Sequence, residues 1–159
     1  MRVFTDASMC PKTASGVGAY LIVYENEPVG LVDESRVQRK EFNNTRSTRL
    51  ELQTLLWALS DLDCSIRKIE VFTDCQNILN LPGRRDRLEA SNYIAKNNRQ
   101  LTNADLYQQF YQYMDQLECT ITKVKGHKSA AQRNDNDRLF AMVDKAARKA
   151  LRARKVRVQ

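Results

Sequence analysis

The tetrapeptide Val-Phe-Thr-Asp occupies residues 3–6 and occurs again at residues 71–74. Each copy is rich in β-branched and aromatic residues, which predicts a strand that ends at its aspartate. Side chains alternate between the two faces of a strand, so Asp6 and Asp74 have the same orientation relative to Phe4 and Phe72. If the strands are parallel neighbours, the carboxylates meet at the edge where open α/β sheets place their sites. Either Asp alone can instead begin a turn or cap a helix.

The hydrophobic pattern on both sides of these copies predicts an α/β fold. Three strands are expected first, at residues 2–7, 17–24 and 29–42, the last being a polar edge strand after a turn at 25–28. From residue 48 the period becomes helical, and helices alternate with strands. We expect a five-stranded mixed sheet flanked by helices, with three antiparallel strands followed by parallel strands. The other strands are expected at 69–73 and 119–124, and the helices at 48–62, 76–81, 105–117 and 135–153.

Length and composition indicate an ordinary globular protein. The chain has 159 residues, of which 42% are hydrophobic and 28% charged, so we expect one domain over residues 1–159. No apolar run approaches the roughly 20 residues of a membrane span, and Asp6 falls where a secretory signal would be apolar. The four cysteines form no Cys-x-x-Cys pair, which favours reduced, largely buried thiols. We therefore expect a cytoplasmic protein without a membrane partner, and a monomer.

The net charge of +7 is concentrated at the C-terminus. Residues 145–159 contain seven basic side chains and no acidic one, whereas residues 1–144 carry equal numbers of each. Such a run, with residues 152–159 as a basic tail, attracts phosphates and would give salt-dependent binding. Cations at a helix C-terminus also complement its dipole, so charge alone leaves both interpretations open.

Two further carboxylates lie on the apolar sides of predicted helices. Glu51 adjoins the stripe formed by Leu52, Leu55 and Leu59, although an exposed helix Glu is the commoner case. Asp144 lies between Val143 and Ala147 on the last helix. With Asp6 and Asp74 they make four carboxylates, and the only histidine, His127, follows the fifth strand. Oxygen ligands without histidine or thiolate suit Mg²⁺ or Mn²⁺, and two such ions can catalyse phosphoryl transfer.

The order of these motifs resembles type 1 ribonuclease H. The resemblance rests on Phe-Thr-Asp-Ala-Ser at 4–8, Arg-Leu-Glu-Leu at 49–52, Phe-Thr-Asp-Cys-Gln at 72–76, Val-Lys-Gly-His at 124–127 and Val-Asp-Lys-Ala-Ala-Arg at 143–148. Residues 101–107 are also similar to the Asn-x-Asp-Leu segment that precedes a helix in that family. Together these pieces cover residues 2–151, nearly the whole chain.

The resemblance implies an endonuclease that hydrolyses the RNA strand of RNA–DNA hybrids and leaves 5′-phosphate and 3′-hydroxyl ends. It implies the ribonuclease H fold and two Mg²⁺ or Mn²⁺ ions held by Asp6, Glu51, Asp74 and Asp144, with Asp6 bridging both. His127 would release product or relay a proton. Contacts to 2′-hydroxyls and to the shape of the hybrid would set specificity. The implied substrate contacts are Ser8, Ser47, Thr48, Arg49, Gln76, Arg84, Arg85, Arg87 and Lys128.

The chain departs from the family pattern in three places. Ser47 and Thr48 stand where many members have Asn-Asn, although hydroxyls can still bond a 2′-hydroxyl. The segment 82–99 keeps the charge of a basic protrusion, but Tyr93 is its only aromatic residue. The stretch from His127 to Asp144 is long, and Asp137 within it is the alternative to Asp144.

Two other functions remain open on the sequence. The first is a binding module of the same fold, which holds hybrid or double-stranded RNA without turnover. The second is another metal nuclease of this fold, such as a junction resolvase or an integrase core.

Overall fold

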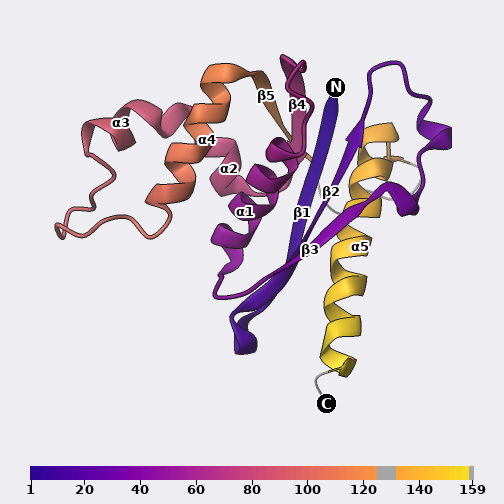
Figure 1. The fold of residues 1–159 in the computed structure, drawn as a ribbon, viewed down its shortest axis with the longest axis horizontal. Coiled ribbons are helices and arrows are strands. Elements are labelled where there is room, and N and C mark those ends of the chain that lie inside the picture. Colours follow the sequence, from indigo (N-terminus) through magenta and orange to yellow (C-terminus); the bar gives the residue numbers. More distant parts are fainter. Residues whose placement is uncertain (125–131, 158–159) are drawn as a thin grey trace.

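A five-stranded sheet runs through the computed structural model, which describes residues 1–124 and 132–157 (Figure 1). The strand order is β3-β2-β1-β4-β5. β1 pairs antiparallel with β2 and parallel with β4, β2 pairs antiparallel with β3, and β4 pairs parallel with β5. The expected mixed sheet, antiparallel and then parallel, is therefore confirmed. Its strands are β1 (Arg2–Cys10), β2 (Ser15–Val23), β3 (Gln38–Phe42), β4 (Lys68–Thr73) and β5 (Glu118–Lys123).

The expected helices are present, with ends that differ by a few residues. The last helix differs most, because it continues to Arg157 rather than ending near Ala153. A short helix after Pro82 was not expected. The α-helices are α1 (Ser47–Ser60), α2 (Gln76–Asn80), α3 (Arg85–Ala90), α4 (Ala104–Gln116) and α5 (Asp135–Arg157), and the 3₁₀ turns are η1 (Pro11–Thr13), η2 (Val29–Leu31), η3 (Glu34–Arg36) and η4 (Pro82–Arg84).

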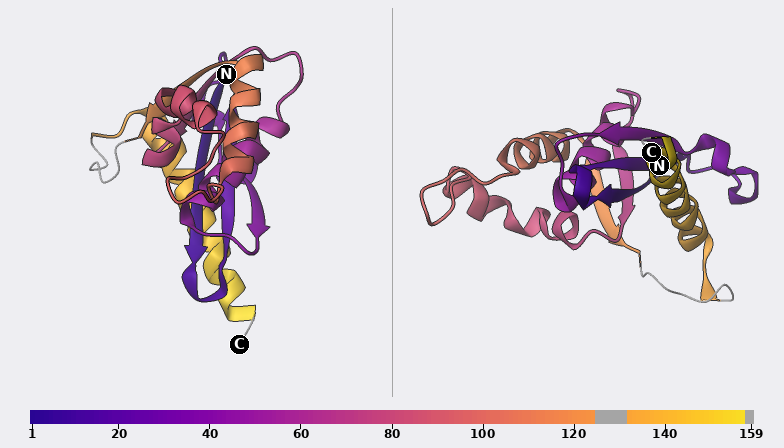
Figure 2. Two further views of the ribbon diagram at one scale, coloured as in Figure 1. Left: turned by 90° about the vertical axis from the view of Figure 1, so that its left-hand side faces the viewer. Right: turned by 90° about the horizontal axis from the view of Figure 1, so that it is seen from below.

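Helices cover both faces of the sheet, and each face has its own hydrophobic core. Figures 1 and 2 show α5 on one side, with α1 and α4 on the other. The period of two in the strands explains this division. Val3 and Val71 pack in the core under α1 and α4, whereas their neighbours Phe4 and Phe72 pack under α5. The strands therefore read as continuous apolar runs, as expected for a sheet that is buried on both faces.

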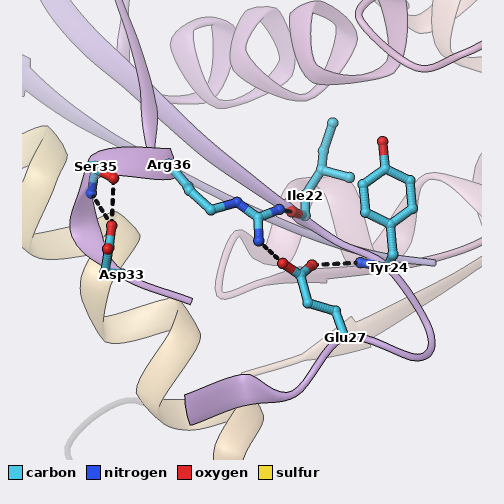
Figure 3. A network of polar contacts seen from close by, with 6 residues as sticks. All are labelled: Ile22, Tyr24, Glu27, Asp33, Ser35 and Arg36. Carbon is cyan, nitrogen blue, oxygen red and sulfur yellow. Dashed lines mark hydrogen bonds and ion pairs between the residues drawn. The ribbon is translucent and has the colours of Figure 1, made fainter. Parts of the chain in front are cut away.

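The third strand is shorter than the sequence pattern suggested. The expectation of a strand over 29–42 is wrong, because only Gln38–Phe42 pairs with β2 and the preceding residues form two 3₁₀ turns. Asp33 begins the second turn by accepting a hydrogen bond from the Ser35 backbone at 2.8 Å. Arg36 holds the segment to the end of β2 through the Ile22 carbonyl, at 2.9 Å, and an ion pair with Glu27 (Figure 3). Local polar contacts thus replace the strand ladder.

Helix α1 lies unusually close to β2, and two glycines permit this. A Cβ atom on Gly18 would come within 2.1 Å of the Thr54 hydroxyl, and one on Gly16 within 2.5 Å of a Leu50 methyl. Leu50 and Thr54 are fully buried. A larger side chain at either glycine would push α1 away from the sheet, and with it the residues that α1 carries.

The thiols and the helices bear on two further expectations. The four cysteines, all among the described residues, form no disulfide. The expected burial is wrong for Cys64, which is exposed; Cys10 is buried and the other two are half-buried. None of the helices in the described part of the chain is long and apolar enough to cross a membrane.

Candidate active site

Asp6 lies on β1, and Asp74 directly follows its parallel neighbour β4. In the β1–β4 pair Val3 lies opposite Val71 and Phe4 opposite Phe72. Asp6 is two positions after Phe4 on β1, so it projects toward the same α5 face. Asp74 follows directly after β4 and lies close enough to Asp6 for its charge to raise the pKa of Asp6. Asp6 is 6% exposed, whereas Asp74 follows the end of β4 and is exposed.

Glu51 reaches these carboxylates from the opposite layer. It lies on α1, yet its pKa responds to both Asp6 and Asp74. The different lengths of the strands explain this approach: β4 ends at Thr73, whereas β1 continues to Cys10. A backbone hydrogen bond from Ala7, just beyond Asp6 on β1, acts on the carboxyl groups of both Asp6 and Glu51. Glu51 therefore meets the aspartates where β4 no longer separates them.

Asp144 is the carboxylate that α5 contributes to this cluster. Its carboxyl group lies within hydrogen-bonding reach of Asp6, and its charge raises the pKa of Asp6. Arg148, one helical turn later, pairs with Asp144 at 2.6 Å. The alternative residue, Asp137, has another task at the start of α5. The Asp137 side chain accepts a hydrogen bond from the Asn134 backbone N–H at 3.0 Å. In return, the Asn134 side chain accepts one from the Asp137 backbone N–H at 2.9 Å. This reciprocal pair is a capping box.

The cluster concentrates negative charge in a poorly solvated place. Burial, followed by the charges of Asp74 and Asp144, raises the pKa of Asp6 to about 7. Burial, followed by the charges of Asp6 and Asp74, raises the pKa of Glu51 to about 9. In a protein without bound cations these carboxylates repel one another, and proton uptake relieves the repulsion. A cation would relieve it equally well.

The donor set of the cluster fits a hard divalent cation. Glu51 Oε2 is buried and has no hydrogen-bond partner, which is costly unless a cation or another donor meets it. Carboxylate oxygens are the ligands that Mg²⁺ and Mn²⁺ prefer. Within residues 1–124 and 132–157, however, no three carboxylate, thiol or imidazole side chains form a ready-made metal site.

Ser47, Thr48 and Arg49 line a groove of about 700 Å³ at the N-terminus of α1. Arg49 does not extend freely into it. Its guanidinium donates to both carboxylate oxygens of Asp105, at 3.0 and 2.7 Å, and to the Thr102 carbonyl at 3.2 Å. Arg49 thus joins α1 to the start of α4. The other residues that line the groove are Asn44, Arg46, Thr102, Asn103 and Asp105.

Sequence reasoning missed this opposite wall of the groove. Residues 102–105 belong to the Asn-x-Asp-Leu segment, which was noted only for its resemblance. The available signal was Asp105 itself, because an acid in the first turn of α4 offers a partner to a cation on a neighbouring helix.

Two other expected substrate contacts lie beside the carboxylates in sequence. Ser8 follows Asp6 by two positions on β1, so it shares the face of Asp6, and it is half-buried. Gln76 is exposed at the start of α2, just after Asp74. Its side chain accepts a hydrogen bond from Lys123 at 3.1 Å and donates one to Asn80 at 2.9 Å. Gln76 is thus held at the carboxyl end of β4 and β5.

The three arginines of the basic segment lie on η4 and α3, and Figure 1 shows α3 apart from the sheet. The Arg85 guanidinium donates hydrogen bonds to Glu89, at 2.8 Å, and to both carboxylate oxygens of Asp115. Arg84 lies over the Tyr107 ring, 5.6 Å from its centroid. Only Arg87 has an exposed side chain. Arg84 and Arg85 therefore attach this segment to α4. His127 and Lys128 lie outside the described residues.

Comparison with known proteins gives one clear finding. Residues 1–152 match the model of the family described as RNase H. This range includes every strand and the whole of α5 apart from its last turn and a half. A search of curated proteins gives no significant match.

Proposed function

Because this chain belongs to the RNase H family, whose activity is cleavage of RNA in RNA–DNA hybrids, we propose that it cleaves this RNA at the cluster of Asp6, Glu51, Asp74 and Asp144 with two Mg²⁺ or Mn²⁺ ions. The observation that carries the proposal is the convergence of four carboxylates from β1, α1, β4 and α5, with a buried Glu51 oxygen that lacks a partner. The chemistry of such a site is that of a cation receptor.

The four carboxylates would hold the ions. When bound, the ions supply Lewis-acid stabilisation of the attacking and leaving oxygens in an in-line displacement at phosphorus. The residues of this chain position the carboxylates. The Ala7 backbone N–H orients Asp6 and Glu51, and Arg148 forms an ion pair with Asp144. Burial excludes water from Asp6, which strengthens its attraction for cations.

Recognition of the RNA strand is assigned to the groove at the N-terminus of α1. The hydroxyls of Ser47 and Thr48 can donate to or accept from a 2′-hydroxyl, which is the group that distinguishes RNA from DNA. Arg49 keeps this wall in place through Asp105. Gln76 contributes from the far side of Asp74. For His127 we propose a role in product release or proton relay, so His127→Ala should slow turnover without abolishing it.

The decisive experiment is cleavage of an end-labelled RNA strand in an RNA–DNA hybrid. Reactions with Mg²⁺, Mn²⁺ or EDTA are compared, and double-stranded RNA, duplex DNA and branched DNA are tested in parallel. We expect metal-dependent cutting of the hybrid's RNA only, with 5′-phosphate products. Asp74→Asn, prepared in the same way, should be inactive, which excludes a contaminating nuclease. Full activity of Asp74→Asn would refute the assigned site.

The same assay separates the alternatives. Tight hybrid binding without cutting under either metal would identify a binding module. Cutting of branched or duplex DNA would identify another nuclease of this fold. Binding of Mg²⁺ is followed independently by the increase in melting temperature, which should occur in the wild-type protein and be lost in Asp6→Asn.

A further inference from the structure

A second basic region lies on the flank of α5 that faces away from Asp144. In an α-helix successive residues are 100° apart, so Asp144 projects beside the buried stripe of Val143, Ala147 and Leu151, whereas Lys149 projects from the exposed side, about 140° from Asp144. Asp144 lies beside Asp6 of β1, and the charge of Lys149 acts on Glu34, which precedes β3. We call the second region the β3–α5 face, and its cations are Arg39, Lys145, Lys149, Arg152 and Arg154.

Electrostatic contacts bring the cations of the two elements together. Glu34 accepts a hydrogen bond from Lys145 at 2.5 Å. The pKa of Glu34 is lowered by this bond, by the charge of Lys145, and then by Lys149 and Arg39. Arg39 from β3 and Lys149 from α5 therefore lie near the same carboxylate. One acid cannot neutralise three cations, so the face keeps an excess of positive charge.

A hollow of about 310 Å³ lies between β3 and α5 on this face. Its apolar part consists of Val17, Ala150 and Ala153, and its charged part of Arg39, Glu41 and Arg154. Lys40 also lines the hollow, but its ammonium lies over the Phe42 and Trp57 rings. The small side chains of α5 leave the space, and the charged ones surround it. This shape admits an anionic group and gives its oxygens cationic neighbours.

Arg154 lines this hollow, and one nitrogen of its guanidinium has no hydrogen-bond acceptor. Its Nε pairs with Glu41 at 3.3 Å and its Nη2 donates to Asn43 at 3.1 Å. Its Nη1 is buried and has no hydrogen-bond acceptor. A buried guanidinium N–H without an acceptor costs free energy, and a phosphate oxygen is among its best partners.

The cations also have the spacing of a polymer contact. Lys145, Lys149 and Arg152 follow the exposed side of α5 over about 10 Å, which corresponds to roughly three phosphates of one strand. Arg39, Lys149 and Arg152 form no ion pair among the described residues. A single small anion would occupy the hollow but leave this row without a partner.

We propose that the β3–α5 face binds the phosphodiester backbone of the hybrid, as a second contact apart from the carboxylate cluster. This inference rests on the proposed function, because it takes the hybrid as the ligand. An α-helix is about 10–12 Å across, comparable to the width of a duplex groove, about 12 Å for the major groove of B-DNA. A duplex that lies across α5 therefore reaches both flanks, provided that it is long enough.

The test compares Arg39→Gln/Lys149→Gln with a control of equal charge change, Arg67→Gln/Lys68→Gln. The control residues are exposed and lie at the start of β4. Binding of a hybrid of about 24 base pairs is measured by fluorescence anisotropy in EDTA, between about 50 and 200 mM salt. Each lost phosphate contact lowers the slope of log Kd against log salt by about 0.9, so we expect a decrease of about 1.8 in the test variant and little change in the control.

A hybrid of about 6 base pairs, roughly 20 Å long, gives the second arm. It offers fewer phosphates, so the absolute decrease in slope should be smaller with it than with the long hybrid. An unchanged slope of the test variant with the long hybrid, or an equal decrease in the control, would overturn the inference. Since binding in EDTA needs no turnover, failure of the proposed catalysis is detected separately.

Discussion

The rings of Phe4 and Phe72 stack across the β1–β4 pair, with centroids 4.7 Å apart and planes inclined by 14°. Each is the second residue of a Val-Phe-Thr-Asp copy, so the stack shows that the repeated tetrapeptides lie side by side in register. The valines occupy one core and the phenylalanines the other. The aspartates two positions later are consequently brought together by the same packing that forms the sheet.

The assignment of the α5 carboxylate makes the first prediction. Asp144→Asn removes a carboxylate beside Asp6 and should reduce the cleavage rate roughly 10²- to 10⁴-fold. This decrease corresponds to a loss of about 3–5 kcal/mol of transition-state stabilisation. Asp137→Asn weakens a capping box and should cost about 1 kcal/mol of unfolding free energy while the folded protein stays active. Specific activity and urea unfolding of both variants are measured together. The opposite pattern would move the site to Asp137.

Glu51 makes the second prediction, on stability without metal. Its carboxyl group must be desolvated beside Asp6 and Asp74, and its pKa is raised to about 9. The folded state therefore binds more protons than the unfolded state between about pH 4.5 and 9, so this residue lowers stability progressively as the pH rises through that window. In EDTA at pH 8, the melting temperature of Glu51→Gln should be about 2–4 °C higher than that of the wild-type protein. This shift corresponds to about 1 kcal/mol of unfolding free energy.

The same substitution should remove the metal response. Addition of Mg²⁺ is expected to raise the melting temperature of the wild-type protein more than that of Glu51→Gln. A variant that is less stable than the wild type in EDTA at pH 8 would show that the Glu51 charge is well compensated.

The third prediction concerns the approach of α1 to β2. Gly18→Ala places a Cβ atom within 2.1 Å of the Thr54 hydroxyl and should cost about 1–3 kcal/mol. Because α1 carries Glu51, cleavage activity should fall as well. Gly30→Ala is the matched control, since a Cβ atom there has no neighbour within 4 Å. Chemical denaturation and cleavage rates decide the matter, and equal stability of the two variants would contradict the close packing.

The fourth prediction concerns Arg49. Arg49→Lys keeps the charge but loses the two-pronged bond to Asp105, so KM for the hybrid should rise with little change in kcat. The pair is partly exposed, with side-chain exposures of 25% and 50%, and should contribute less than about 1 kcal/mol to stability.

A pH series checks the same pair. The hydrogen bond from Arg49 lowers the pKa of Asp105, so its stabilising contribution is present above the unfolded pKa and is lost as the pH falls through the folded value. Arg49→Lys should lose less stability than the wild type on acidification. A change in kcat with constant KM would instead place Arg49 at the chemistry.

The sequence alone was sufficient for a mixed sheet of three antiparallel strands followed by parallel strands, because the hydrophobic period changes from strand to alternating helix and strand after residue 48. It was insufficient for residues 29–37, where Asp33 and Arg36 find local partners that no periodicity reports. It also could not distinguish free from occupied cations. Arg49 and Arg85 were assigned to substrate, yet both have carboxylate partners far away in the chain. Ion pairs between distant residues leave no local pattern.

The register of the two tetrapeptides also constrains how the chain can change in length. Insertion or deletion of one residue within 3–6 or 71–74 would turn one aspartate to the opposite face of the sheet, under α1. Substitutions there alter one side chain, whereas a single-residue length change misplaces every side chain beyond it. Descendants of this sequence should therefore vary in length elsewhere, in the turn at 24–37 or the segment at 82–103, and keep these two strand segments without gaps.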